Sequence, residues 1–148
     1  MRFRNRLVNP VVRLLLRSPL HPVLRRSLVI LSYQGRKTGR WRSLPCLYAR
    51  DGQDLYVVPG QAGRKVWWRN LRQPTRVRLR LQGRDREGIA ASSDPEAVAA
   101  GLRHYLARYP KAARPLGVRL DADGIPHGTT TAAHPLVVVR VHLDRRQR

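Results

Sequence analysis

The sequence has almost no cysteine. Cys46 is the single cysteine among 148 residues, which excludes a disulfide framework and any cysteine-rich metal site. It lies inside an apolar run, so we expect it to pack in the core rather than act as a nucleophile. Five histidines are scattered along the chain, and no two have the spacing of a helical zinc motif: His21, His104, His127, His134 and His142. We therefore expect no metal site.

Acidic residues are also scarce. The chain has 9 Asp plus Glu against 30 Lys plus Arg, a formal net charge of +21 at pH 7. With so few carboxylates and no Ser-His-Asp signature, the sequence offers no catalytic dyad. Such a positive field attracts polyanions, which leaves nucleic acid, an anionic membrane surface, or a small ligand carrying phosphates and carboxylates. Arginine suits forked contacts to such oxygens, although arginine-rich codon usage gives the same composition.

Long hydrophobic runs are missing too. The longest near the start is Leu14–Leu16, bounded by Arg13 and Arg17, far short of the roughly 20 residues that a membrane-spanning helix needs. A signal peptide is poorly supported, because Arg13 splits the apolar stretch and no small-residue cleavage site follows. The expected location is cytoplasmic.

Residues 1–22 form a basic amphipathic segment. Pro10 suits the first turn of a helix, and Arg13 and Arg17 share one stripe of that helix among apolar neighbours. One interpretation is attachment of residues 1–20 to anionic lipid, which would place the protein at the inner face of the membrane. The other is a helix that packs on the domain and exposes its arginines to water. The sequence leaves both open.

The rest of the chain has the pattern of an α+β protein. Apolar and alternating stretches predict strands at residues 27–33, 42–49, 54–59, 75–81, 86–91 and 135–143, a short helix at 66–71 and a longer helix from Ser93 to Pro110. The first of these strands, the "SLVILSY" run, is short and β-branched, and Pro45 in the second implies an edge, a bulge or a strand start. Residues 111–134 have the composition of a loop.

These elements predict one domain over residues 1–148. The expected fold is a small antiparallel split β-barrel of about six strands, with the basic helix at the N-terminus and the longer helix after the fifth strand. No repeats occur, and residues 144–148 form a charged tail.

The connection between the first two strands is longer and more polar than a hairpin needs. Residues 35–40 read GRKTGR, where two glycines permit a turn whose backbone N–H groups form a concave nest. Thr38 adds a hydroxyl, and Arg36, Lys37 and Arg40 add positive charge. A solvated hairpin tip and a cradle for a phosphate are both compatible with this stretch, since it has the spacing of neither a P-loop nor a dinucleotide fold.

The order of several features resembles a known family. The GRKTGR turn, Pro45 in the next strand, a glycine loop after the third strand, and the WWRNL segment together resemble the deazaflavin-dependent nitroreductases, split β-barrel proteins that use coenzyme F420. The resemblance runs from about Leu28 to Ala91. It implies a small-molecule oxidoreductase in which reduced F420 passes a hydride from carbon 5 to a conjugated acceptor such as a quinone or nitro compound, while the protein supplies position and electrostatics.

The resemblance also implies which residues bind the coenzyme. The turn would contact the phosphate, and the end of the third strand with its loop would lie along the deazaflavin ring. The residues that this predicts are Arg36, Lys37, Thr38, Gly39, Arg40, Pro45, Val57, Val58, Pro59, Gly60, Gln61, Gly63, Trp67 and Asn70. The acceptor pocket is assigned to aromatic residues, namely Trp41, Tyr48, Trp68, Tyr105 and Tyr109. Core packing for the tryptophans and a helix cap for Asn70 are the competing interpretations.

The chain departs from the family pattern in two respects. The segment from Gly60 to Trp67 is shorter than the family's glycine loop and lacks the proline before the tryptophan, and VVPG stands where the family has a strand end of small residues. A related barrel that binds FMN, FAD, haem or no cofactor therefore stays open. A nucleic-acid binding module is the rival from another class, but with one phenylalanine and no aromatics interleaved in residues 75–81 we expect no specific nucleic-acid partner. Split barrels of this kind often pair, so a homodimer through Trp68 is a further expectation.

Overall fold

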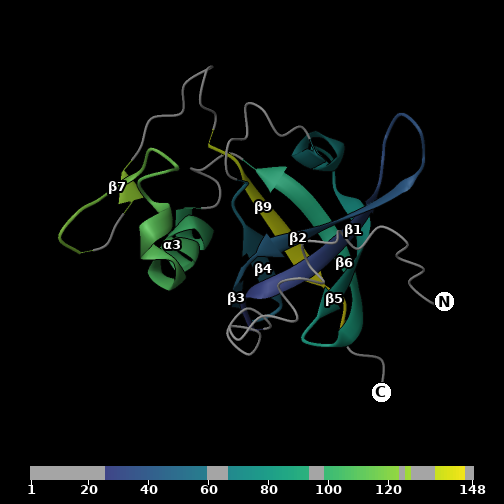
Figure 1. The fold of residues 1–148 in the computed structure, drawn as a ribbon, viewed down its shortest axis with the longest axis horizontal. Coiled ribbons are helices and arrows are strands. Elements are labelled where there is room, and N and C mark those ends of the chain that lie inside the picture. Colours follow the sequence, from purple (N-terminus) through teal and green to yellow (C-terminus); the bar gives the residue numbers. More distant parts are fainter. Residues whose placement is uncertain (1–25, 60–66, 94–98, 124–125, 128–135, 146–148) are drawn as a thin grey trace.

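One antiparallel sheet organises the molecule. The computed structural model describes residues 26–59, 67–93, 99–123, 126–127 and 136–145. Seven strands join in the order β2-β1-β5-β6-β9-β4-β3 (Figure 1). Their bounds are Leu28–Gln34 (β1), Trp41–Leu47 (β2), Ala49–Asp51 (β3), Asp54–Val57 (β4), Thr75–Leu81 (β5), Arg84–Ser93 (β6) and Val138–Leu143 (β9).

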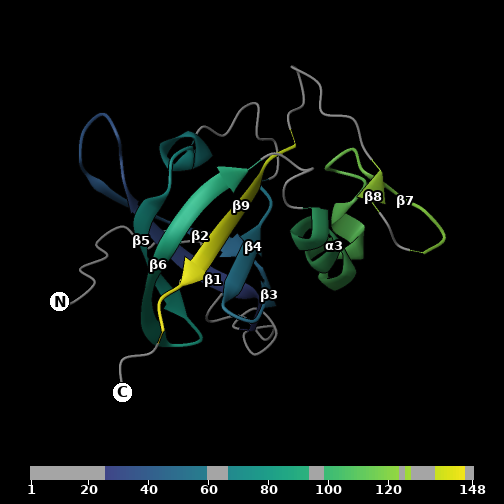
Figure 2. The same cartoon turned by 180° about the vertical axis from the view of Figure 1, so that it is seen from behind.

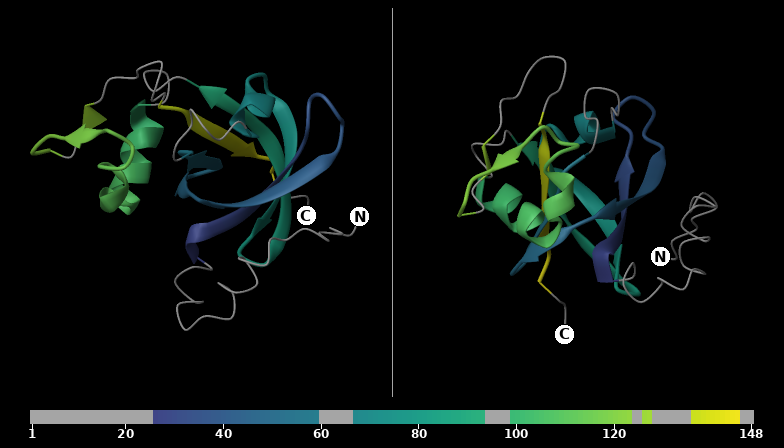
Figure 3. Two further views of the ribbon diagram at one scale, coloured as in Figure 1. Left: turned by 45° about the horizontal axis from the view of Figure 1, so that its top comes forward. Right: turned by 60° about the vertical axis from the view of Figure 1, so that its left-hand side comes forward.

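The sheet curls so that its two edges come together. Strands β2 and β3 form the edges, yet they are consecutive in the chain and only Tyr48 separates them. A sheet whose first and last strands share one continuous segment must bend back on itself, and Figure 3 shows this curvature in its left view. Pro45 lies in β2, an edge strand, where a missing backbone donor costs no ladder bond on the free side. The expected split β-barrel in an α+β chain is confirmed.

Strict alternation along the strands separates the inside of the barrel from the outside. In β5, Val77, Leu79 and Leu81 are buried, while the arginines between them lie on the outer face, as a half-buried antiparallel strand requires. Gln82 and Gly83 both have positive φ, 49° and 77°, which matches the tight turn that joins β5 to β6. The inward side chains form one core cluster that includes Val29, Leu31, Leu55, Val139 and Leu143.

A helical layer covers part of the outer surface. The helix α3 (Ala99–Arg108) packs on β3 and β4, and a second cluster of Tyr56, Val58, Leu102, Tyr105, Leu106 and Val138 fills the space between them. Figure 2 shows α3 beside β4. Gly101 permits this close approach, because a Cβ there would overlap the ring of Tyr56. Beyond α3 lie a short 3-10 helix, Pro110–Ala112 (η2), and a small hairpin of Arg119–Leu120 (β7) and Pro126–His127 (β8).

The structure corrects several element boundaries. The strand expected at 42–49 is divided at Tyr48 into β2 and β3, because the chain crosses there from one sheet edge to the other. The segment 111–134, expected to be loop, contains β7 and β8 in its described part, and the last strand begins at Val138 rather than Pro135. The basic segment 1–22 lies outside the described residues.

Candidate anion-binding site

A six-residue connection joins β1 to β2. Its ends are closed by the Gly35 N–H, which donates to the Arg40 carbonyl at 2.8 Å, and by the Gly39 N–H, which donates to the Gly35 carbonyl at 2.8 Å. Gly39 has a φ of +67°, a backbone conformation that favours glycine over other residues. The Arg40 N–H donates to Thr38 Oγ1 at 3.3 Å, so the Thr38 hydroxyl proton stays available to another acceptor.

A side chain from a distant segment fixes this turn in place. The 3-10 helix Trp67–Leu71 (η1) carries Asn70, whose Oδ1 accepts the Arg36 backbone N–H at 3.0 Å. The Asn70 Nδ2 group donates to the Trp67 carbonyl at 3.0 Å, which holds the amide in one orientation. Asn70 therefore does more than cap its own helix: it ties η1 to the β1–β2 turn across 34 sequence positions.

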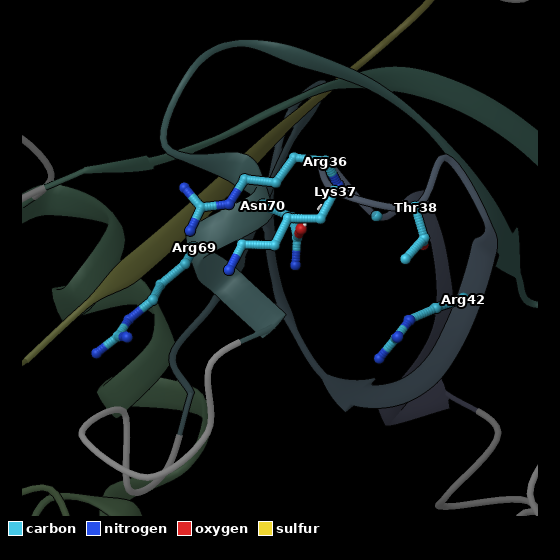
Figure 4. Close-up of a pocket in the computed structure, with 7 residues that line it drawn as sticks. Arg36, Lys37, Thr38, Arg42, Arg69 and Asn70 are labelled. Atoms are coloured by element: carbon cyan, nitrogen blue, oxygen red, sulfur yellow. Dashed lines mark hydrogen bonds between the residues drawn. The ribbon is translucent and has the colours of Figure 1, made fainter.

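The turn and η1 enclose a pocket of about 280 Å³. We call it the turn pocket, and the residues that line it are Gly35, Arg36, Lys37, Thr38, Arg42, Arg69 and Asn70. Figure 4 shows Arg36 and Lys37 extending from the turn across η1, with Thr38 and Arg42 on the other side. Four of the lining residues are cationic and none is a carboxylate. Among the described residues, none of these four cations forms an ion pair with Asp or Glu.

The backbone contributes less to this pocket than the sequence predicts. A nest of successive N–H donors was expected across GRKTGR, but the N–H groups of Gly35, Arg36, Gly39 and Arg40 are all used within the turn or by Asn70. Among the described residues, only the Lys37 and Thr38 N–H groups of the turn form no such bond. The positive character of the pocket therefore comes mainly from side chains.

Arg69 has an enclosed donor without a partner. Its Nε is buried, and among the described residues it is the one enclosed side-chain nitrogen or oxygen that makes no hydrogen bond. The guanidinium carbon lies 5.6 Å from the centroid of the Trp68 ring, a contact that orients the group without satisfying Nε. An enclosed charged donor without an acceptor is costly, and an anion in the turn pocket would supply the acceptor.

Three of the lining residues were not among the predicted site residues: Gly35, at the start of the turn, and two arginines. Arg42 lies in β2, two residues after the end of the turn, and Arg69 lies between Trp68 and Asn70 in η1. The chain contains so many arginines that neither stood out. The alternation of β2 carried a signal for Arg42, because Leu44 and Cys46 continue the inward face on which Arg42 lies.

The residues predicted to lie along the ring occupy the neighbouring part of the barrel. Val57, Val58 and Pro59 are buried at and just after the end of β4, and Val57 belongs to the barrel core. Trp67 is half-buried and packs against that core. Pro45 is half-buried in β2, opposite Ile30 of β1. Gly60, Gln61 and Gly63 lie outside the described residues.

Neither of the tryptophans assigned to the acceptor pocket lines the turn pocket. Trp41 is 41% exposed on the outer face of β2, where the Arg78 guanidinium lies 4.3 Å from its ring centroid. Trp68 is 8% exposed, and its ring is covered by Arg69 and Arg72, each 5.6 Å from the centroid.

The three tyrosines of that assignment gather at another place. The Tyr48 hydroxyl accepts a hydrogen bond from Gln82 Nε2 at 3.3 Å, and the Tyr109 hydroxyl donates to the Tyr48 carbonyl at 2.6 Å. Tyr105 is buried under α3, with its ring 4.9 Å from that of Tyr109. The structure thus does not bring the five aromatic candidates together, and the acceptor pocket stays a prediction.

Within the described ranges, no group of three or more His, Cys, Asp or Glu side chains is arranged to hold a metal ion. In the same ranges, no helix has the length and apolar character needed to cross a bilayer.

One family of proteins matches the chain by sequence. The model of the F420H(2)-dependent quinone reductase family matches residues 7–119, which is well over half of the 148 residues. The match includes the whole turn pocket and α3. A comparison with curated protein sequences found no match.

Solved structures share the fold at low sequence identity. A structure described as an F420-H2 dependent reductase (FDR-A) aligns with a TM-score of 0.59 and 18% identity over 78% of this chain and 94% of that chain. A structure described as a domain-swapped dimer gives 0.58 and 17% over 78% and 80%. HutZ, the heme storage protein of Vibrio cholerae, gives 0.51 and 14% over 87% and 91%. At these identities the likeness shows a common barrel fold.

Proposed function

Because the chain belongs to the F420H(2)-dependent quinone reductase family, we propose that the turn pocket holds the phosphodiester of coenzyme F420. Membership makes the chain a deazaflavin-dependent oxidoreductase, so the predicted enzyme class and coenzyme are confirmed. The observation that carries the assignment of the pocket is its charge: four cations face one cavity that no carboxylate lines.

The donors of the pocket suit an anion with several oxygens. Lys37 offers three N–H donors, Arg42 a planar fork, and Thr38 a hydroxyl proton. Each charge-assisted hydrogen bond contributes on the order of 1.5–3 kcal/mol. One phosphodiester does not need the donors of Arg36 and Arg69 in addition. These two guanidinium groups suit the carboxylates of the coenzyme's glutamate tail. A volume of about 280 Å³ lies just below the usual range for whole ligands, so the pocket fits the charged part of the coenzyme.

The ring of the coenzyme is assigned to the barrel mouth next to this pocket. Trp67 lies three residues before Asn70 and packs against the barrel core, and Val57, Val58 and Pro59 supply buried apolar surface at the end of β4. These residues would exclude water and fix the ring plane. When bound, the reduced coenzyme supplies a hydride to its acceptor. The chain's own part is to bind and orient, which agrees with the lack of an acid–base dyad in the turn pocket.

Quinone is the acceptor that the family description favours. A quinone with an apolar tail resides in a bilayer, so we propose a cytoplasmic enzyme that contacts the inner face of the membrane, with residues 1–20 as the attachment. That segment lies outside the described residues. The proposed attachment is supported by the alternation of arginine with apolar residues in its sequence. Sedimentation with anionic and with neutral liposomes, before and after removal of residues 1–20, tests the attachment.

A homodimer is the second partner we propose. Its support is that a similar structure is described as a domain-swapped dimer. Light scattering of the purified protein at several concentrations measures the mass, and the value of a single chain at every concentration would contradict the proposal.

The assignment of the pocket is tested by titration. Purified protein is titrated separately with F420, FMN and a short oligonucleotide, and fluorescence is followed. We expect saturation with F420 at micromolar concentration, because several charge-assisted bonds act together, and weaker binding of FMN. Binding of F420 that inorganic phosphate does not weaken would show that the phosphodiester lies elsewhere. Salt-sensitive binding of the oligonucleotide alone would favour the nucleic-acid interpretation.

A further inference from the structure

Tyr33 is a buried polar residue that the proposed function does not use. It lies in β1, two residues before the turn pocket begins at Gly35. Its side chain is only 3% exposed and belongs to the barrel core. A tyrosine so deeply buried normally has a hydrogen-bond partner for its hydroxyl.

The Tyr33 hydroxyl has no such partner among the described residues. It is also not an enclosed atom, because within the described residues Arg69 Nε is the one enclosed, unpartnered side-chain nitrogen or oxygen. The ring is therefore buried while the hydroxyl still reaches accessible space. The other tyrosine of the barrel core, Tyr48, differs in this respect, since its hydroxyl accepts a hydrogen bond from Gln82.

The surroundings of Tyr33 join the turn pocket to the ring site. Across the β1–β2 ladder it stands opposite Arg42, which lines the turn pocket. On its other side is Trp67, with ring centroids 6.3 Å apart and planes at 35°. The inward face of β2 also opens toward this place: Cys46 is 7% exposed, Leu44 is half-buried and Arg42 is exposed.

The protonation state of Tyr33 suits a donor. The largest influence on the pKa of the Tyr33 phenol is burial, which raises it. The Arg42 guanidinium lowers this pKa, and Cys46 raises it. The phenol therefore keeps its proton at neutral pH, and a neutral phenol can donate a hydrogen bond.

We propose that the Tyr33 hydroxyl donates a hydrogen bond to a carbonyl oxygen of a planar conjugated ring bound between Trp67 and the inward face of β2. This inference rests on the proposed function, which places the coenzyme ring at that mouth. Both the deazaflavin ring and a quinone carry such carbonyl oxygens, and the experiment below separates the two sources.

The test compares Tyr33→Phe with the matched control Tyr56→Phe. Both remove one hydroxyl from a buried tyrosine, but Tyr56 lies in β4, belongs to the second core cluster beneath α3 and is assigned to neither the coenzyme nor the acceptor. Without ligand, we expect both variants to unfold close to the wild-type temperature, because neither hydroxyl has a hydrogen-bond partner among the described residues.

With ligand, the two variants should differ. Tyr33→Phe should bind its ligand about three- to tenfold more weakly, the usual loss for one neutral hydrogen bond, and the ligand should raise its unfolding temperature less than that of the wild type. Tyr56→Phe should bind as the wild type does. If the ring is that of the coenzyme, the absorbance band of bound F420 also shifts in Tyr33→Phe without any acceptor. If it is that of a quinone, F420 binding and its band stay unchanged and KM for the quinone rises.

Two results would overturn the inference. One is that Tyr33→Phe has the wild-type affinity for F420, the wild-type absorbance of bound F420 and the wild-type KM for the quinone. The other is a loss of stability in the ligand-free variant, which would mean that the hydroxyl serves the fold. A wild-type protein that binds no F420 at all would instead remove the proposed function, so the two failures are distinguishable.

Discussion

The arginines of β5 and those of the turn pocket have the same chemistry but different surroundings. On the outer face of β5, Arg76 lies 2.7 Å from Asp144 and Arg80 lies 2.9 Å from Asp85, and Arg78 lies over the Trp41 ring. In the turn pocket, Arg36 and Arg42 have no carboxylate partner among the described residues. Several of the 9 acidic residues pair with arginines of β5, and none of them lines the turn pocket.

This difference shows that net charge alone does not identify a binding site. A formal charge of +21 predicts attraction to anions anywhere on the surface. Cations that already have a carboxylate partner have less to gain from a ligand. Cations that surround a cavity with no carboxylate are placed to bind an anion there.

The largest effect is expected from removing two pocket cations. Lys37→Ala combined with Arg42→Ala should weaken F420 binding at least about 100-fold, because two charge-assisted hydrogen bonds are lost. Fluorescence titration at constant ionic strength measures the change.

The control removes the same charge from β5. Arg76→Ala combined with Arg80→Ala lowers the net charge equally but touches exposed ion pairs, which contribute little. F420 affinity should change by no more than about twofold, the small share expected from a distant, screened field. Equal losses in the two double variants would show that the field of the whole protein, and not the turn pocket, determines affinity.

Asn70 tests whether the pocket must be held together. Asn70→Ala removes the bond to the Arg36 N–H and frees the turn from η1, so we expect about tenfold weaker binding of F420. Asn70→Asp also places a negative charge among the four cations and should be worse. If both variants bind F420 as tightly as the wild type does, the turn keeps its shape without the link to η1.

Salt dependence sharpens the same contrast. Raising the ionic strength from about 0.1 M to about 1 M shortens the Debye length from roughly 10 to roughly 3 Å, and wild-type F420 binding should weaken about tenfold. The Lys37→Ala, Arg42→Ala variant should show a flatter dependence, while the β5 double variant should follow the wild type. A common slope for all three proteins would place the ion-dependent contacts outside the pocket.

The smallest effect on binding is expected beneath α3. Burial raises the pKa of Tyr105 to about 12, above the usual value of about 10. Between these values the unfolded chain loses this proton while the folded protein keeps it, so stability falls as pH rises from about 10 to about 12. In Tyr105→Phe that part of the fall in unfolding temperature should be absent. F420 binding at neutral pH should stay within about twofold of the wild type, and a larger change would tie the helix layer to the site.

Much of the fold could be predicted because each strand carries its own pattern. The alternation Val77, Leu79, Leu81 fixes the buried face of β5 without reference to any other element. The division of the second strand at Tyr48 could not be predicted, since it depends on where the curled sheet brings its two edges together. The hairpin of β7 and β8 is short and lies next to glycine-rich sequence, so it has little periodicity to detect.

The site was predictable where neighbouring residues form it. Lys37 and Thr38 follow from the glycine-flanked turn, and the structure places both in the pocket. Arg69 and the link from Asn70 to Arg36 join segments 34 positions apart. No local pattern encodes such a contact, and a single arginine has no distinguishing mark in so basic a chain.

The sequence by itself determined the barrel strands, the polar turn and the family, because hydrophobic period, glycine position and motif order are local properties of the chain. Only the tertiary structure decided which arginines lack carboxylate partners and which tyrosine hydroxyl stays open. Both depend on distances between residues far apart in sequence, and those distances exist only after the sheet has curled.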